Sequence, residues 1–295
     1  MFNYIFERFL PIGAIDIACN YIKLPEKDLT WKIKLVNGKE VITKIHKDKA
    51  CTWPFAYQWQ NPSINALEGV LNTYYGKSAA YIDIGANLGV RSLTALSAGR
   101  QVFMFEPNAG INSFNEERCR INGFKDYRIF GSCLSSSEGE AVFFFDNTSY
   151  LSSFHQERIM PGNIARSEKV KLTTLDAFSK KYLSQFPEVF IKIDVEGHEM
   201  EVIKGGCGLI KEMHPVMLIE INEKGRHILE IFDLMRQFGY SIIAVAKKPK
   251  FGFFKLGSNN DLENLPFASD DFLFTKEKGL EELLFSQFPS SSPCP

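Results

Sequence analysis

The chain has 295 residues, of which 45% are hydrophobic and 23% charged, and its net charge is -1. These values are typical of a soluble globular protein with a sizeable core, built as one large α/β domain or two small ones. The balance of 34 basic and 35 acidic residues gives no reason to expect nucleic acid as a partner.

Six cysteines are spread along the chain at wide, irregular intervals, and no two of them form a C-x-x-C pair. This spacing does not support a zinc site or thioredoxin-like chemistry. Scattered thiols suit a reducing compartment, and we therefore predict a cytoplasmic location.

The first 25 residues are apolar, but Glu7, Arg8 and Pro11 interrupt them. The segment lacks a basic start and an unbroken apolar run, so it predicts neither a signal peptide nor a transmembrane helix. A short amphipathic helix that docks on the body is one interpretation, and a membrane-surface anchor is the alternative.

The next segment, "WKIKLVNGKEVITKI", alternates around Asn37 and Gly38 and predicts a β-hairpin. The aromatic, proline-broken stretch "CTWPFAYQWQNP" follows, and we interpret it as a surface loop or a pocket lid. Its aromatic side chains suit either stacking on a sugar or anchoring of this region: Trp53, Phe55, Tyr57 and Trp59. We assign residues 1–63 to an N-terminal appendage of helix and hairpin.

From residue 64 the chain alternates between helical patterns and short apolar runs. Helices are predicted at 64–75, 90–99, 108–123, 173–183, 197–206 and 225–239, and strands at 79–85, 101–107, 126–134, 188–194, 215–222, 240–246 and 270–276. Residues 139–147 predict a further strand, inserted at the edge of a sheet. Such alternation indicates a mostly parallel sheet with helices on both faces, and ligands bind such sheets beyond the carboxyl ends of the strands.

One glycine-rich loop, "DIGANLG", follows the first of these strands and opens a helix. Gly85 permits a tight turn and the close approach of a ligand to the backbone, and Gly89 lets the helix start lie near the strand. Glu106 lies about twenty residues further on, at the end of the next strand, where a carboxylate can accept both hydroxyls of a ribose.

The loop fits one class of nucleotide cofactor better than another. A dinucleotide usually requires G-x-G-x-x-G, because its pyrophosphate binds backbone N–H groups at a helix start. Here the third glycine is absent, and Asp83 would repel a phosphate. S-adenosylmethionine carries positive charge, a ribose and no phosphate, so Asp83 and Glu106 together favour it.

Five ordered motifs resemble those of the FkbM-type S-adenosylmethionine-dependent methyltransferases: "YIDIGANLGVRSLTA", "VFMFEPN", "TTLDAF", "IKIDVEGHEMEVIKGG" and "PVMLIEIN". The resemblance covers about residues 64–276. It implies the Rossmann-like class I methyltransferase fold, a mostly parallel seven-stranded sheet with helices on both faces and a final antiparallel strand. The reversed strand would then be "DDFLFTK".

The resemblance also implies which residues contact the cofactor: Asp83, Gly85, Asn87, Gly89, Glu106, Pro107, Asn108, Ser132 and Asp194. It implies adenine near residues 132–135. Many relatives carry an acid there that holds the adenine amine, whereas this chain reads "GSCLSSSEG", so the adenine-contacting side chain is left open.

The stretch "IKIDVEGHEM" supplies the candidate catalytic residues. Asp194 ends a strand facing the cofactor cleft and is the first candidate to orient or deprotonate an acceptor, with a helix N-cap as its alternative role. Glu196 is its expected helper, although acids in a first helical turn are also stabilised by the helix dipole. His198 is a candidate base by its ordinary pKa, or, like Glu199, a charge on the helix surface.

No metal is predicted within this stretch, because its polar side chains do not share a helix face. A composite Mg²⁺ site of Asp194, Glu220 and Asn222 stays open by analogy with some O-methyltransferases. The serine- and aromatic-rich stretch at 147–156 is either a substrate lid, with Ser153 and His155 as weak candidates, or a plain surface loop.

We therefore predict a methyltransferase domain over residues 64–278, followed by a partly disordered tail at 279–295. The predicted activity is S-adenosylmethionine-dependent O-methylation of a sugar or natural-product hydroxyl, on a small-molecule or glycan acceptor. No transmembrane segment is expected, and a homo-oligomer is compatible with the sequence. Two alternatives are a non-catalytic S-adenosylmethionine-binding protein and a nicotinamide-dependent oxidoreductase.

Overall fold

The computed structural model describes residues 29–35, 37–45, 61–146, 152–159, 162–222, 226–247 and 250–289. The predictions for the N-terminal helix, the aromatic stretch around Trp53 to Trp59 and the last residues of the tail lie outside these ranges.

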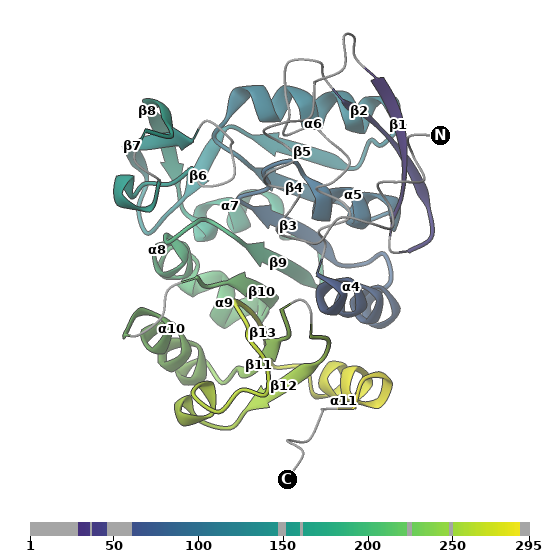
Figure 1. Ribbon diagram of the computed structural model, residues 1–295, viewed down its shortest axis with the longest axis vertical. Helices are drawn as coiled ribbons and strands as arrows, with labels where there is room; N and C mark the ends of the chain where they lie inside the picture. The colour runs from purple at the N-terminus through teal and green to yellow at the C-terminus, as the bar shows by residue number, and fades with distance from the viewer. Residues whose placement is uncertain are drawn as a thin grey trace.

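A mixed sheet in the strand order β12-β11-β13-β10-β9-β3-β4-β5 forms the centre of the molecule (Figure 1). Its strands are β3 (Ala80–Ile84), β4 (Val102–Phe105), β5 (Tyr127–Phe130), β9 (Val189–Ile193), β10 (Val216–Glu220), β11 (Ser241–Val245), β12 (Phe253–Leu256) and β13 (Asp271–Thr275). β13 is antiparallel to both of its neighbours, and the five strands from β10 to β5 are parallel, which confirms the predicted sheet and its reversed strand.

One strand was not predicted. β12 pairs antiparallel with β11 at the edge of the sheet, so the sheet has eight strands. Its four residues are too few to show a periodic pattern in the sequence.

Helices cover both faces of the sheet, as predicted. On one face lie α4 (Pro62–Tyr75), α5 (Val90–Ser97), α6 (Ala109–Ile121) and α11 (Lys278–Gln287). On the other lie α7 (Leu175–Tyr182), α8 (Glu199–Lys204), α9 (Cys207–Met213) and α10 (Arg226–Gln237). Each face encloses its own apolar cluster, because alternate side chains of the central strands point to opposite sides.

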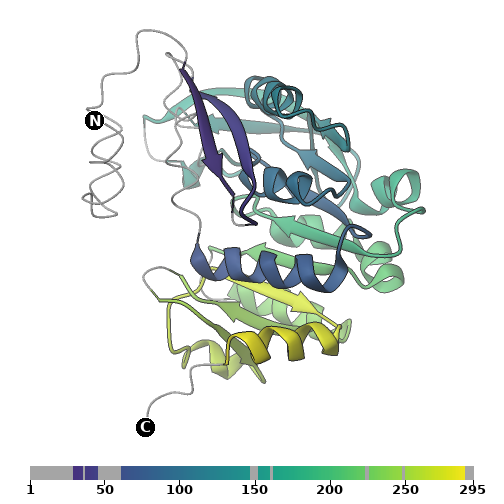
Figure 2. The ribbon, with the colours of Figure 1, turned by 90° about the vertical axis from the view of Figure 1, so that its right-hand side faces the viewer.

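α11 begins just before the segment that we assigned to the tail. Leu280 and Leu284 are fully buried, and the helix packs beside α4, as Figure 2 shows. The burial of these two leucines on one helix face makes the first part of that segment a component of the folded core.

A small second sheet, in the order β6-β8-β7, is inserted after β5. It comprises β6 (Ser132–Leu134), β7 (Gly139–Asp146) and β8 (Ile164–Thr173), with a short 3₁₀ turn, η2 (Gln156–Arg158), in the connection from β7 to β8. The single strand predicted at 126–134 is broken at Gly131, and its second half joins this sheet. β7 is an edge strand, as predicted, while β8 was missed.

The predicted hairpin is present as β1 (Leu29–Lys34) and β2 (Glu40–Ile45), with Gly38 at φ 79° in the turn. It packs on the body through an apolar cluster of Ile33, Leu35, Val41 and Leu93, and Asn122 at the end of α6 bonds to its second strand. Asn122 accepts the Ile42 N–H at 2.6 Å and donates to the Ile42 carbonyl at 2.7 Å. The amide thereby satisfies both backbone groups of a strand residue.

Candidate active site

The glycine loop joins β3 to α5 and crosses the end of β9. Gly85 has φ 75°, and a Cβ placed there would lie 1.8 Å from the Asp194 carbonyl oxygen. The Asp194 N–H also donates to the Ile84 carbonyl at 3.0 Å. The sequence predicted close approach of a ligand at Gly85, whereas the close contact in this structure is with the protein's own backbone.

The N–H groups of this loop are used within the protein. Those of Gly85 and Ala86 both donate to the Phe105 carbonyl at 3.0 Å, and that of Gly89 donates to Ala86 at 2.7 Å. The Asn87 N–H donates to Oε2 of Glu106 at 3.1 Å. A pyrophosphate would have to compete with these four bonds for its usual partners.

Glu106 lies at the end of β4, at the predicted place beside the loop. Its other carboxylate oxygen accepts the Asn108 N–H at 2.8 Å, and burial raises the pKa of Glu106 to about 7. Pro107 follows it, and Asn108 caps α6 by accepting the Gly110 N–H at 3.0 Å. The carboxylate thus connects the glycine loop to the turn into α6.

Asp83, the acid of the loop motif, is only 1% exposed. Oδ2 accepts the Ser92 hydroxyl at 2.6 Å, and Oδ1 has no hydrogen-bond partner among the described residues. Burial raises the pKa of Asp83, while the neighbouring Lys192 ammonium opposes that shift.

Lys192 is a central residue of the site that the sequence analysis missed. Its ammonium lies 2.8 Å from Oδ2 of Asp194 and 4.0 Å from Oδ1 of Asp83, which faces it across β3 and β9. Burial lowers the pKa of Lys192, but the two carboxylates outweigh burial and raise it. A charged residue inside an otherwise apolar strand was the available signal.

Asp194 leaves β9 at the predicted edge of the sheet, but it is not a helix cap. α8 begins at Glu199 with His198 at the N-cap position, because the intervening loop turns first at Glu196 and Gly197, both at positive φ. The N-cap role that we considered for Asp194 is therefore wrong, and its side chain forms the ion pair with Lys192 instead.

Glu196 lies beside Asp194 in this loop. Burial raises its pKa to about 7, the charges of Asp194 and Glu199 contribute to the shift, and a hydrogen bond from the Asn222 side chain opposes it. The backbone has φ 50°, an uncommon conformation for a residue with a side chain. The fold therefore places Glu196 close to both Asp194 and Asn222.

The interpretation of His198 and Glu199 as surface charges is wrong. Glu199 is 2% exposed and accepts the Gly197 N–H at 2.8 Å. Nε2 of His198 lies 2.9 Å from the Ser135 hydroxyl, the ring lies 4.4 Å from that of Phe154, and burial lowers the pKa of His198 to about 4. The reason is that the inserted sheet and its loop pack over the start of α8.

The insertion contacts the same loop at two further points. The buried hydroxyl of Ser153 donates to the Glu196 carbonyl at 2.8 Å, and a Cβ on Gly197 would lie 2.3 Å from the Arg158 guanidinium. The charge of Arg158 also opposes the rise in the pKa values of Glu196 and Glu199. The described part of the predicted lid, residues 152–156, and the residues up to Ile159 that follow it therefore lie against the loop that carries Glu196 and Gly197.

Two more carboxyl groups complete this edge of the sheet. Glu220 faces Asp271 across β10 and β13, and Asn222 donates to Glu220 at 3.2 Å. The Asp194 charge raises the pKa of Glu220 to about 9, and burial raises that of Asp271 to about 6. Within the described ranges, no three His, Cys, Asp or Glu side chains converge as metal ligands.

The predicted adenine region lies nearby in the small sheet. Ser132 begins β6, which pairs with β8, and Ser135 follows that strand with its hydroxyl on His198. The residues predicted to contact the cofactor therefore lie at or just beyond the carboxyl ends of β3, β4 and β9 and at the start of β6.

This geometry can be compared with known proteins. A model of the FkbM methyltransferase domain matches residues 83–242, which is more than half of the chain. The chain belongs to the FkbM methyltransferase family. The match begins at Asp83 and includes the glycine loop, Glu106 and the Asp194 loop, so the family's model spans the three parts of the candidate site.

Solved structures similar to this FkbM methyltransferase domain are distant in sequence. The methyltransferase FkbM of Methylobacillus flagellatus KT is 16% identical with a TM-score of 0.45, and the match covers 67% of this chain and 43% of that one. A SAM-dependent methyltransferase of Agrobacterium tumefaciens is 12% identical with a TM-score of 0.42, covering 85% of this chain and 72% of that one. This chain therefore spans less than half the length of the first protein.

No curated protein matches the sequence of this family member. Within the described residues, every helix is too short or too polar to cross a lipid bilayer.

Proposed function

We propose that this FkbM-family protein is an S-adenosylmethionine-dependent methyltransferase that methylates a hydroxyl group of a sugar or natural product in the cytoplasm. The observation that carries the cofactor assignment is the internal use of the loop N–H groups. With the N–H groups of Gly85, Ala86, Asn87 and Gly89 bonded within the protein, the loop favours a ligand without phosphate.

The side chains present fit such a cofactor. Asp83 keeps a buried oxygen without a hydrogen-bond partner among the described residues, and Glu106 presents a carboxyl group at the end of β4. We propose that Glu106 binds the ribose hydroxyls and that Asp83 provides negative charge for the methionine part. When bound, S-adenosylmethionine supplies the methyl group as an electrophile.

The chain's own contribution to the reaction is to position an acceptor and to take its proton. We propose Glu196 as the proton acceptor, because a pKa of about 7 matches the working pH of a general base. Asp194, held by Lys192 at 2.8 Å, then orients the acceptor hydroxyl. His198 is the second candidate base, since its lowered pKa keeps the imidazole neutral, but Nε2 already lies against Ser135.

Calorimetry with S-adenosylmethionine and with its demethylated product tests the cofactor assignment. We expect binding of both, weaker binding in Glu106→Ala, and in Asp194→Ala a larger loss of turnover than of cofactor affinity. No binding of either compound would contradict the proposal, and binding of NAD would favour the oxidoreductase alternative.

A screen of alcohol acceptors, read by release of the demethylated product, tests the activity. Transfer to a sugar or natural-product hydroxyl is the expected result. Cofactor binding without transfer to any acceptor in a broad screen would favour the non-catalytic alternative, and activity that disappears with EDTA would indicate the composite metal site at Asp194, Glu220 and Asn222.

A further inference from the structure

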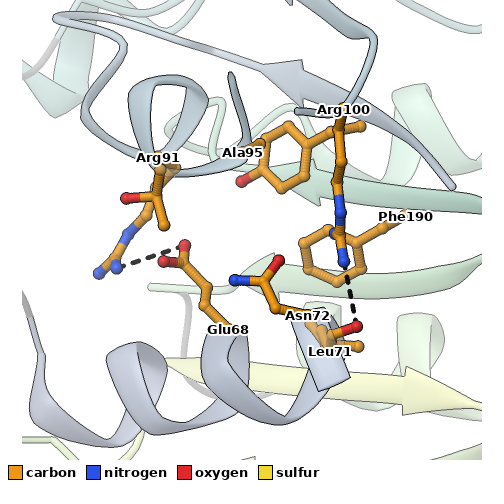
Figure 3. A pocket seen from close by; sticks show the side chains of 9 residues that line it. Glu68, Leu71, Asn72, Arg91, Ala95, Arg100 and Phe190 are labelled. Carbon is orange, nitrogen blue, oxygen red and sulfur yellow. Dashed lines mark hydrogen bonds and ion pairs between the residues drawn. The ribbon is translucent and has the colours of Figure 1, made fainter. Parts of the chain in front are cut away.

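A small polar pocket lies on the face of the sheet that α4 and α5 cover. Residues from both helices and from the central strands β3 and β9 line it, as Figure 3 shows for seven labelled side chains. The pocket does not include the acid residues of the Asp194 loop. It adjoins the candidate active site, because the charges of Asp83 and Lys192 act on Glu68, but none of its lining residues belongs to the candidate site.

Three buried oxygen atoms in the residues lining this pocket have no hydrogen-bond partner among the described residues. They are Oε2 of Glu68 on α4, the hydroxyl of Tyr81 on β3 and the hydroxyl of Thr94 on α5. These side chains are 6%, 2% and 2% exposed. A buried polar group without a partner costs about 1–3 kcal/mol, and three such atoms from three elements around one pocket indicate a common missing partner.

The charges around the pocket restrict what that partner is. An ion pair joins Arg91 to Oε1 of Glu68 at 3.4 Å, and Arg100 donates to the carbonyls of Leu71 and Gly76 at 3.0 Å. The two guanidinium groups disfavour a cation, and the Glu68 carboxylate disfavours an anion. A small neutral molecule that both donates and accepts hydrogen bonds satisfies all three oxygens.

We infer that this pocket is a binding site for an ordered water molecule, which accepts or donates hydrogen bonds at Glu68, Tyr81 and Thr94. The space suits about one water molecule and excludes an organic ligand. The water is the link through which α4, β3 and α5 share hydrogen bonds. Burial raises the pKa of Glu68, which is consistent with a carboxyl group cut off from bulk solvent.

Two conservative substitutions test the inference through the sign of a stability change. If the water is present, Tyr81→Phe and Thr94→Val each remove one of its hydrogen bonds, and each should lower the Tm by about 2–4 °C. If the pocket is dry, both variants remove an unpaired buried oxygen, and the Tm should rise or stay the same.

Thr43 on β2 provides a matched control. Its hydroxyl is also fully buried without a hydrogen-bond partner among the described residues, but it does not line the pocket. Thr43→Val should therefore raise the Tm or leave it unchanged, in contrast to Thr94→Val. A fall in Tm as large as that of Thr94→Val would contradict the inference, because it would show that loss of any buried threonine hydroxyl destabilises this fold.

A high-resolution crystal structure gives an independent answer that does not depend on the variants. We expect electron density for a water within hydrogen-bond distance of the Tyr81 hydroxyl and Oε2 of Glu68. An empty pocket at that resolution, or Tm values of Tyr81→Phe and Thr94→Val at or above that of the unmodified protein, would overturn the inference.

Discussion

The ammonium of Lys192 lies 2.8 Å from Asp194 and 4.0 Å from Asp83, so one cation serves the acid of the cofactor loop and the acid of the acceptor loop. Glu220 also lies within its electrostatic reach. Removing one partner of a buried ion pair leaves the other charges uncompensated.

Lys192→Met should therefore destabilise the fold and lower turnover, whereas Lys192→Arg should retain most of both. We expect a loss of about 3 kcal/mol in the free energy of unfolding for the methionine variant, the lower end of the range for buried pairs, because Asp194 is partly exposed. Chemical denaturation measures this loss. Equal free energies of unfolding for Lys192→Met and Lys192→Arg would show that stability does not need a positive charge at this position.

The pKa of about 7 at Glu196 predicts the pH dependence of turnover. A general base acts when deprotonated, so the rate at saturating cofactor should rise with pH and level off above about 7. Glu196→Gln should lower that rate about 10²-fold or more and remove this limb of the profile.

Glu106 also has a pKa of about 7, so the cofactor Kd must be measured over the same pH range. If Kd changes with pH while the rate at saturating cofactor does not, the titration belongs to Glu106, and Glu196 is not the base.

Glu220→Gln should stabilise the protein, and increasingly so at higher pH. The negative charge of Asp194 is the main reason that the pKa of Glu220 is raised to about 9 in the folded protein. The unfolded chain releases this proton near the usual pKa of glutamate, whereas the folded protein retains it up to a higher pH. Stability from the native glutamate therefore falls as pH rises from about 5 to 9, while glutamine keeps the carbonyl that accepts from Asn222.

Thermal unfolding of Glu220→Gln and of the unmodified protein, measured across this pH range, gives the difference in their stability. We expect the difference in the free energy of unfolding to grow from near zero at pH 4 to roughly 1 kcal/mol or more at pH 8. A stability difference that becomes smaller as the pH rises would contradict the raised pKa of Glu220.

Gly85→Ala should abolish the native arrangement of the cofactor loop. Its Cβ would lie 1.8 Å from a backbone oxygen at φ 75°, which the structure can relieve only by moving the Asp194 loop. We expect a loss of more than about 3 kcal/mol in the free energy of unfolding and loss of cofactor binding.

Gly123→Ala is the matched control, because this glycine has φ 69° with no atom within 4 Å of the added Cβ. It should cost only the backbone strain of about 1–2 kcal/mol and leave binding unchanged. Similar losses in the two variants would mean that positive φ alone, and not contact with Asp194, makes Gly85 necessary.

Local patterns predicted the elements of the main sheet because its strands are apolar runs separated by helices of normal length. They also placed Asp83 and Glu106 near the ends of two strands, β3 and β4, which are neighbours in the sheet. β12, α9 and α11 were not predicted, and α11 lies almost wholly in the segment that we assigned to the tail. Packing of β12 against β11 and of α11 against α4 places these two elements in the fold.

The part of the site that sequence did not reveal depends on contacts between distant segments. Lys192 matters because Asp83 faces it across a strand pair, and register is not visible in one sequence. His198 and Glu199 follow the pattern of a charged helix start, yet Phe154 and Arg158 of the insertion cover them. At these residues, tertiary packing determines the environment of the side chain, and local sequence preference does not.

The contact between Gly85 and the Asp194 backbone has a mechanical consequence. The glycine loop after β3 and the Asp194 loop after β9 are joined through backbone atoms, so under the proposed function the cofactor-side and acceptor-side carboxylates are held at a fixed separation. The distance between donor and acceptor groups is then set when the chain folds. The inserted residues 152–159 are attached to these loops differently, through side-chain contacts of Ser153, Phe154 and Arg158.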